Sequence, residues 1–157
     1  MQKKGQAAME FLMTYGWAIL AAVIAIGVLA YFGVFSPGKY VSGSAVVTPP
    51  FYMNAWNVQA DTGAGSSGAI LELQNNGGEV YTVTGINIDG TAPDIDCTTG
   101  VITTGISVGT AQAFTVGCAS ALTTGNNYKG DITITYTKPS STVVLTSTGT
   151  IAEKITA

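Results

Sequence analysis

Histidine and arginine are absent from this 157-residue chain, and charged side chains make up only 10% of it. The lack of histidine excludes a Ser-His-Asp triad, the commonest general base and histidine metal ligands. Six lysines against nine carboxylates give a net charge of −3, which excludes the basic surface that nucleic-acid binding needs. We therefore expect no catalytic residues, no cofactor and no nucleic-acid partner.

Charge is missing altogether from one long segment near the N-terminus. The 25 residues from Phe11 to Phe35 include no charged side chain, and as a helix they would extend about 37 Å, enough to span a bilayer core. The helix should end at Ser36-Pro37-Gly38, because proline lacks an N–H donor and restricts the residue before it. Lys3 and Lys4 precede the segment, which weakly favours a cytoplasmic N-terminus.

Two simpler interpretations of this segment fit poorly. A secretory signal peptide has an apolar region of about 7–15 residues that ends in small residues, whereas this one is longer and ends in Tyr31-Phe32-Gly33-Val34-Phe35. A plain membrane anchor explains the length. It does not explain Glu10, which would lie where the helix enters the membrane.

The rest of the chain is rich in Thr, Gly, Ser and Val and indicates β structure. Ile132–Thr137 alternates strictly between apolar and polar residues, as a half-buried strand does. Asn75-Asn76-Gly77-Gly78 predicts a hairpin turn between strands at 70–73 and 80–83, and Asp89-Gly90 predicts a second turn. About seven or eight short strands at this spacing favour an antiparallel, immunoglobulin-like sandwich.

The expected fold class is therefore α+β, a long N-terminal hydrophobic helix followed by an all-β immunoglobulin-like sandwich. The helix should cover 6–35, a linker 36–44 and the β domain 45–157. Further strands are predicted at 51–58, 101–103, 113–116, 143–145 and 150–155.

Cys97 and Cys118 are the only cysteines, and both lie in the predicted β domain. If that domain is extracellular, a disulfide is the expected state. It would close a loop of about 20 residues and contribute roughly 3 kcal/mol; two unpaired thiols are the alternative. Asp89, Asp94 and Asp96 lack the spacing of an EF-hand. We interpret them as a solvated loop and expect no metal site.

The N-terminal residues Lys3-Lys4-Gly5, followed by Gln6-Ala7-Ala8-Met9-Glu10 and the apolar run, resemble the class III signal peptide of archaeal type IV pilins. The resemblance implies that a membrane-embedded prepilin peptidase cuts between Gly5 and Gln6. Residues 1–5 would be the leader, and Glu10 would become the fifth mature residue. It further implies a single-pass membrane precursor with its N-terminus in the cytoplasm. That precursor would become a homopolymeric extracellular filament on the cell surface, with helices in its core, β domains outside and a role in adhesion.

Elementary electrostatics explains why a glutamate would be useful close to the cleavage site. Cleavage creates an α-amine at Gln6, and Glu10 lies one helical turn away, so the two can pair within one chain or between neighbours. An ionisable group in apolar surroundings is expensive, so such pairing would set the axial register of a filament. The alternative is a lone glutamate that reaches the headgroups. Rival functions are an archaellin-type subunit, a minor pilin or tip adhesin, and a membrane-anchored extracellular binding module.

Overall fold

The structure is a computed structural model that describes residues 3–32, 43–63 and 66–157. The chain divides into two compact units, Met1–Tyr40 and Val41–Ala157. Most of the predicted linker, 36–44, lies outside the described residues, as do the last three residues of the predicted helix. Each unit is described below by itself.

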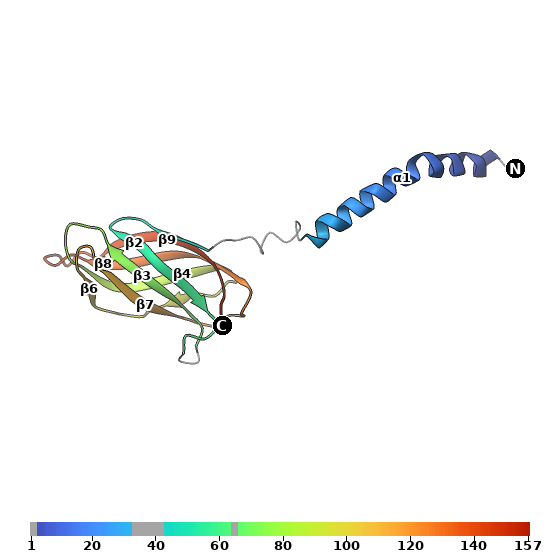
Figure 1. The fold of residues 1–157 in the computed structure, drawn as a ribbon. Helices are drawn as coiled ribbons and strands as arrows, with labels where there is room; N and C mark the ends of the chain where they lie inside the picture. The colour runs from blue at the N-terminus through green and yellow to red at the C-terminus, as the bar shows by residue number, and fades with distance from the viewer. Residues whose placement is uncertain (1–2, 33–42, 64–65) are drawn as a thin grey trace. The chain divides into compact units, whose positions relative to one another are not determined.

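The first unit is the helix α1, Lys3–Tyr31 (Figure 1). It begins three residues earlier than the predicted start at Gln6, so Gly5 and Gln6 both lie inside it. None of its described side chains is buried. A helix that is apolar on every side, with no polar face, belongs in the core of a larger structure or in a membrane. Ala8–Tyr31, 24 residues, is long and apolar enough to cross a membrane.

The second unit is a nine-stranded sheet. Its strands are β1 Ser44–Val47, β2 Phe51–Gln59, β3 Gly68–Asn75, β4 Tyr81–Ala92, β5 Cys97–Thr98, β6 Thr104–Ile106, β7 Ala111–Cys118, β8 Asn127–Thr137 and β9 Leu145–Lys154. Their order is β1-β9-β8-β4-β5-β7-β3-β2, with β6 paired to β4. All strand pairs are antiparallel.

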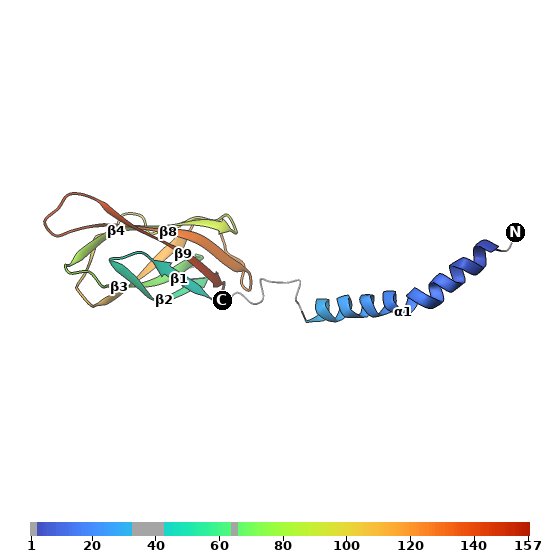
Figure 2. The ribbon, with the colours of Figure 1, turned by 90° about the horizontal axis from the view of Figure 1, so that it is seen from above.

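The sheet folds back on itself at β5. Cys97 and Thr98 pair with β4 on one side and with β7 on the other. They therefore join a wall of β1, β9, β8 and β4 to a wall of β7, β3 and β2, and Figure 2 shows β4 and β8 lying over β3 and β2. The α+β class is confirmed. The strands form one continuous, barrel-like sheet, so the two separate sheets of an immunoglobulin-like sandwich are not confirmed.

The core lies between the two walls and follows from the alternation of apolar residues along each strand. In β8, Tyr128, Ile132 and Ile134 are fully buried, whereas Lys129, Asp131 and Thr133, which alternate with buried positions, are exposed or half-buried. Burying each such side chain stabilises the fold by about 1.5–3 kcal/mol. Phe51, Tyr81 and Tyr136 close one end of the core with edge-to-face rings whose centroids lie 5.1–6.0 Å apart. Every buried hydrophobic residue of the described chain belongs to this unit.

The predicted hairpin at Asn75–Gly78 is wrong. β3 pairs with β2 and β7, whereas β4 pairs with β8, β5 and β6, so this loop crosses from one wall to the other. The reason is the Asn75 side chain, which is completely buried. Its amide nitrogen donates to the carbonyls of Glu79 and Ile106 at 2.8 Å each, and its oxygen accepts the Gly77 N–H. These bonds tie the loop to β6 instead of to a hairpin partner.

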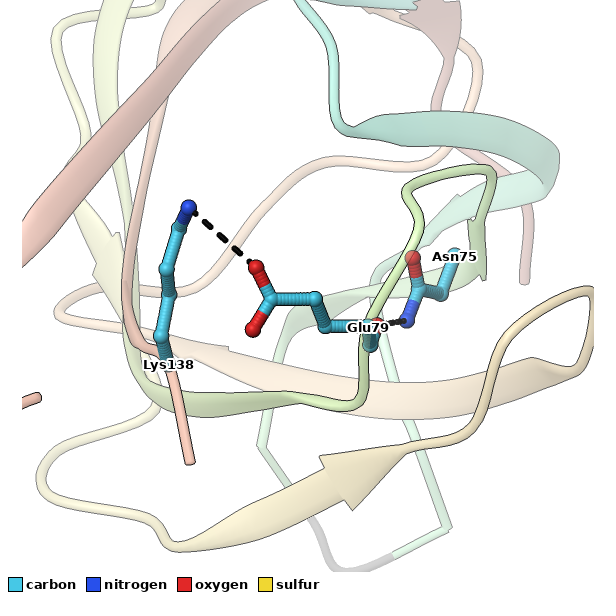
Figure 3. Close-up of polar contacts among 3 residues, drawn as sticks. All are labelled: Asn75, Glu79 and Lys138. Carbon is cyan, nitrogen blue, oxygen red and sulfur yellow. Dashed lines mark hydrogen bonds and ion pairs between the residues drawn. The ribbon is translucent and has the colours of Figure 1, made fainter. Parts of the chain in front are cut away.

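Figure 3 shows how the same loop also contacts the β8–β9 connection. The Glu79 carboxylate lies 3.4 Å from the Lys138 ammonium, and both side chains are more than two-fifths exposed. An exposed ion pair of this kind contributes only about 0–1 kcal/mol. The buried Asn75 amide, whose loss would strand several polar groups, is therefore the main anchor of the loop.

The predicted turn at Asp89-Gly90 is also wrong, because β4 continues through it to Ala92. Asp89 faces Asp131 and Gly90 faces Gly130 across the β4–β8 pair. A Cβ atom at Gly90 would lie 2.1 Å from the carbonyl oxygen of Ile95. Glycine is needed here because another segment of backbone passes close to the strand.

Strand boundaries differ elsewhere in smaller ways. β6 begins at Thr104, just after the predicted 101–103 segment, and β9 begins at Leu145, so Val143 and Val144 precede it and are exposed. The pattern missed β1 and β5, which are too short to show a period. The strands predicted around 51–58, 113–116, 132–137 and 150–155 are confirmed.

The C-terminal residues close the barrel. Thr156 donates its N–H to the Val58 carbonyl and accepts the Ala60 N–H, both at 2.9 Å, which joins the end of the chain to the free edge of β2. Ile155 is 1% exposed and packs in the core. These residues therefore connect the two walls on the side opposite β5.

This closure predicts a large effect of a single side chain. Replacing Ile155 with alanine should lower the free energy of unfolding by about 2–5 kcal/mol, because it leaves a cavity where the C-terminal residues join β2. The matched control is Lys154→Ala, which removes an exposed side chain and should change stability by less than about 0.5 kcal/mol. Denaturant unfolding of the full chain in detergent, followed by circular dichroism, measures both. Equal stability of the two variants would contradict the role of Ile155 in closing the barrel.

Candidate processing and assembly site

The predicted cleavage site lies in the first turns of α1. The Gly5–Gln6 peptide bond is helical in the uncut chain, and Gly5 is exposed. Apart from Gly5, its two neighbours in the chain and the adjacent helix backbone, no described atom lies within 4 Å of where a Cβ at Gly5 would be. Glycine in a helix costs roughly 0.5–1 kcal/mol relative to alanine. The fold of the chain therefore supplies no reason for glycine at this position.

Glu10 is the first carboxylate of the chain, and the next is Asp61. It is exposed on α1, and it has no ion-pair partner among the described side chains. Its backbone carbonyl accepts the Thr14 hydroxyl at 2.8 Å, which satisfies Thr14 within the helix. No hydrogen bond or ion pair of the carboxylate itself joins it to a described side chain.

The structure places Gln6 and Glu10 four residues apart on one helix, an axial rise of about 6 Å. The side chains of Lys3, Lys4 and Gln6 lie outside the described residues. Because the chain is uncut, Gln6 carries no α-amine here. The pairing of Glu10 with that amine stays a prediction.

The predicted disulfide is present. Cys97 and Cys118 lie directly opposite each other on β5 and β7, with their Cα atoms 3.8 Å apart. The disulfide therefore lies where β5, a strand of only two residues, joins the two walls of the sheet. It reinforces the shortest strand of the unit.

Tyr128 of β8 contacts this disulfide, and it is not among the residues predicted from the sequence to form a site. Its buried hydroxyl donates to the Ile95 carbonyl at 2.8 Å and lies 3.3 Å from the Cys97 sulfur. Burial, followed by the nearby carboxylates of Asp96 and Asp89, raises the pKa of Tyr128 to about 12. The alternation in β8 indicates that Tyr128 is buried. Only the fold shows what its hydroxyl contacts.

Asp89, Asp94 and Asp96 are not among any described group of side chains that could hold a metal ion. Asp96 instead accepts the Gly90 N–H at 3.1 Å, which fixes the loop before β5. Across the described residues, no group of three or more His, Cys, Asp or Glu side chains is arranged to hold a metal ion.

Two surface hollows of the β unit are open to solvent and lined by neutral residues. One, of about 230 Å³, lies around Ser67 and Cys118, and another, of about 260 Å³, lies over Thr84 and Thr133. No charged residue lines either hollow, so neither carries an acid–base pair.

Comparison with known proteins finds no matching family model and no matching curated protein.

The raised pKa of Tyr128 predicts how stability depends on alkaline pH. An unfolded tyrosine ionises near pH 10 and Tyr128 near pH 12. The folded chain therefore holds this proton more tightly, and the free energy of unfolding should fall by about 2–3 kcal/mol as the pH rises through that interval. Tyr128→Phe should remove this loss, whereas Tyr52→Phe, at an exposed site, should keep it. Denaturant unfolding of the full chain at stepped pH provides the test, and identical slopes in both variants would refute the assignment.

Proposed function

We propose that this chain is a structural subunit of an extracellular archaeal type IV-like pilus. The observation that carries the proposal is one exposed apolar helix that contains both Gly5 and Glu10. Gly5 has no role in the fold, and Glu10 has no partner among the described side chains. A peptidase and a neighbouring subunit would give each residue its function. Both needs arise together in the class III signal peptide that residues 3–12 resemble.

The surface of α1 suits two environments in succession. In the precursor, Ala8–Tyr31 would cross the membrane, with the N-terminus in the cytoplasm. In the filament, the same surface would pack against other copies. Ala18 and Ala22 form a small-xxx-small pair that permits close helix approach. Lateral association would replace lipid with protein without exposing the helix to water.

The β unit would form the filament surface. It buries its own core without α1, and its disulfide is typical of an oxidising, extracellular location. We propose adhesion as its role, with no catalytic activity, cofactor or nucleic-acid partner. We also retain the immunoglobulin-like relationship as a proposal. Its support is that two antiparallel walls enclose one core.

Three other functions would give different results. An archaellin would be required for swimming. A minor pilin or tip adhesin would be scarce in purified filaments. A membrane-anchored binding module would stay in the membrane and never polymerise. Electron microscopy of sheared surface filaments, with mass spectrometry of their main subunit, distinguishes these from the proposed major subunit.

Processing gives the first test of the proposal. The filament subunit should begin at Gln6, and Gly5→Leu should leave uncut precursor in the membrane. Because no described atom crowds Gly5, the leucine should leave the helix folded, so the failure would lie in cleavage. N-terminal peptide mapping checks the first expectation and an immunoblot the second. Filaments that retain Met1 would count against the proposal.

Assembly gives the second test, through Glu10→Gln. Removing one partner of a buried ion pair typically costs about 3–5 kcal/mol, because the other charge is left unpaired. The cost recurs at each subunit, so filament numbers should collapse while membrane insertion and cleavage continue. The measurement is a count of surface filaments beside an immunoblot of the processed subunit.

The matched control for this test is Glu79→Gln. It makes the same chemical change on the β unit, where it removes only an exposed ion pair with Lys138, and it should leave filament numbers unchanged. Wild-type filament numbers with Glu10→Gln would show that Glu10 does not set the register. They would favour the simple membrane anchor.

A further inference from the structure

Among the described strands, β7 leaves part of one edge unpaired. β7 pairs with β3 from Ala111 to Gly117, but on its other side it pairs with β5 only at Gly117 and Cys118. The residues of an antiparallel strand direct their N–H and C=O groups to the two sides alternately. It follows that part of β7 has backbone groups with no strand beside them.

Two backbone hydrogen bonds establish which groups these are. The Cys118 N–H donates to Ser67, on the β3 side, and the Ala119 N–H donates to Asp96, on the β5 side, each at 2.9 Å. The backbone N–H and C=O groups of the even-numbered residues of β7 therefore point toward β3. Those of the odd-numbered residues point to the opposite side. The outward groups belong to Ala111, Ala113 and Thr115. We call these three residues the open edge.

The nearest strand in the sequence does not cover the open edge. β6 is joined to β7 by residues 107–110 alone, yet it pairs with β4. The Ile106 carbonyl accepts the buried Asn75 amide instead of a β7 N–H. Within the described chain, the one hydrogen bond to the open edge comes from the Gln112 side chain, which donates to the Ala113 carbonyl at 3.2 Å.

The open edge also lacks the features that keep exposed strands apart. Natural edges are protected by charged side chains, especially lysine, or by proline. From Cys97 to Tyr128 the sequence contains neither a charged residue nor a proline. Ala111, Gln112 and Ala113 are all exposed, and the two alanines leave room for another backbone. Val101 and Val108, on either side of β6, are 94% and 52% exposed.

We propose that the open edge pairs with an extended segment of a second copy of this chain. An uncharged edge does not repel a copy of a chain with net charge −3, and it offers no charge to attract a differently charged partner. Unpaired N–H and C=O groups recognise any extended backbone, so a neighbour held close by the helices would be favoured. This inference rests on the proposed function, because the filament supplies that neighbour.

Hydrogen exchange of the full chain provides the test, with filaments compared with detergent-dispersed subunits. The amides of Ala111, Ala113 and Thr115 should exchange at least about tenfold more slowly in filaments. The amides of Gln112, Phe114 and Val116 bond to β3, so they should be protected equally in both states. Equal exchange of the odd-numbered amides in both states would overturn the proposal.

A pair of variants at one position separates edge pairing from general packing. Ala113→Pro removes the outward N–H and keeps the bonds to β3, a change that edge strands tolerate. Ala113→Val keeps that N–H. Filaments of the proline variant should dissociate under milder heating than those of the valine variant. Equal dissociation would also overturn the proposal.

The test remains decisive if the wild-type chain forms no filaments, a result that would refute the proposed function. Sedimentation of the detergent-dispersed chain at increasing concentration then replaces the exchange comparison. Self-association that Ala113→Pro abolishes and Ala113→Val retains would support the open edge on its own. Absence of self-association, or its persistence in the proline variant, would refute it.

Discussion

The helix α1 has apolar side chains on all sides and buries none of those described within its own chain. The rest of the architecture depends on this constraint. An apolar helix must find apolar surroundings, and α1 is long and apolar enough for a membrane to supply them. Because α1 contributes nothing to the core, the β unit has to close its own core between two walls.

Three devices achieve that closure, and each connects segments far apart in the sequence. Cys97 and Thr98 of β5 join the walls on one side, with the disulfide beside them. Ile155 and Thr156 join them on the other side. The buried amide of Asn75 holds the loop that crosses between the walls. A self-contained β unit can therefore be displayed on any support that holds α1.

An apolar helix joined to a β unit that has its own core is consistent with the proposed filament subunit. Among the described residues, nothing packs against Gly5 and no side chain forms an ion pair with Glu10, and the proposed function would give both residues a role in contacts with other molecules. The open edge of β7 likewise has no strand beside it among the described residues, and its side chains are small and uncharged. In the proposed filament, a copy of the same chain would complement each of these features.

Local patterns in the sequence determined a large part of this structure. The absence of charge from Phe11 to Phe35 predicted the helix, and the alternation in Ile132–Thr137 predicted which residues of β8 face the core. The leader-like residues, Glu10 and the two cysteines were also identified from the sequence. The helix and strand predictions succeed because burial constrains the composition and period of one segment at a time, whereas the roles of the leader-like residues and Glu10 stay predictions.

Only the tertiary structure decided how the strands are partnered. Asn75–Gly78 has the composition of a hairpin turn but crosses between walls, and Asp89-Gly90 lies within a strand that passes close to Ile95. The two residues of β5, the contacts of Tyr128 and the open edge of β7 were likewise invisible in the sequence. The physical reason is that hydrophobic alternation records which face of a strand is buried. The choice of neighbour depends on hydrogen bonds and close packing between residues distant in the chain.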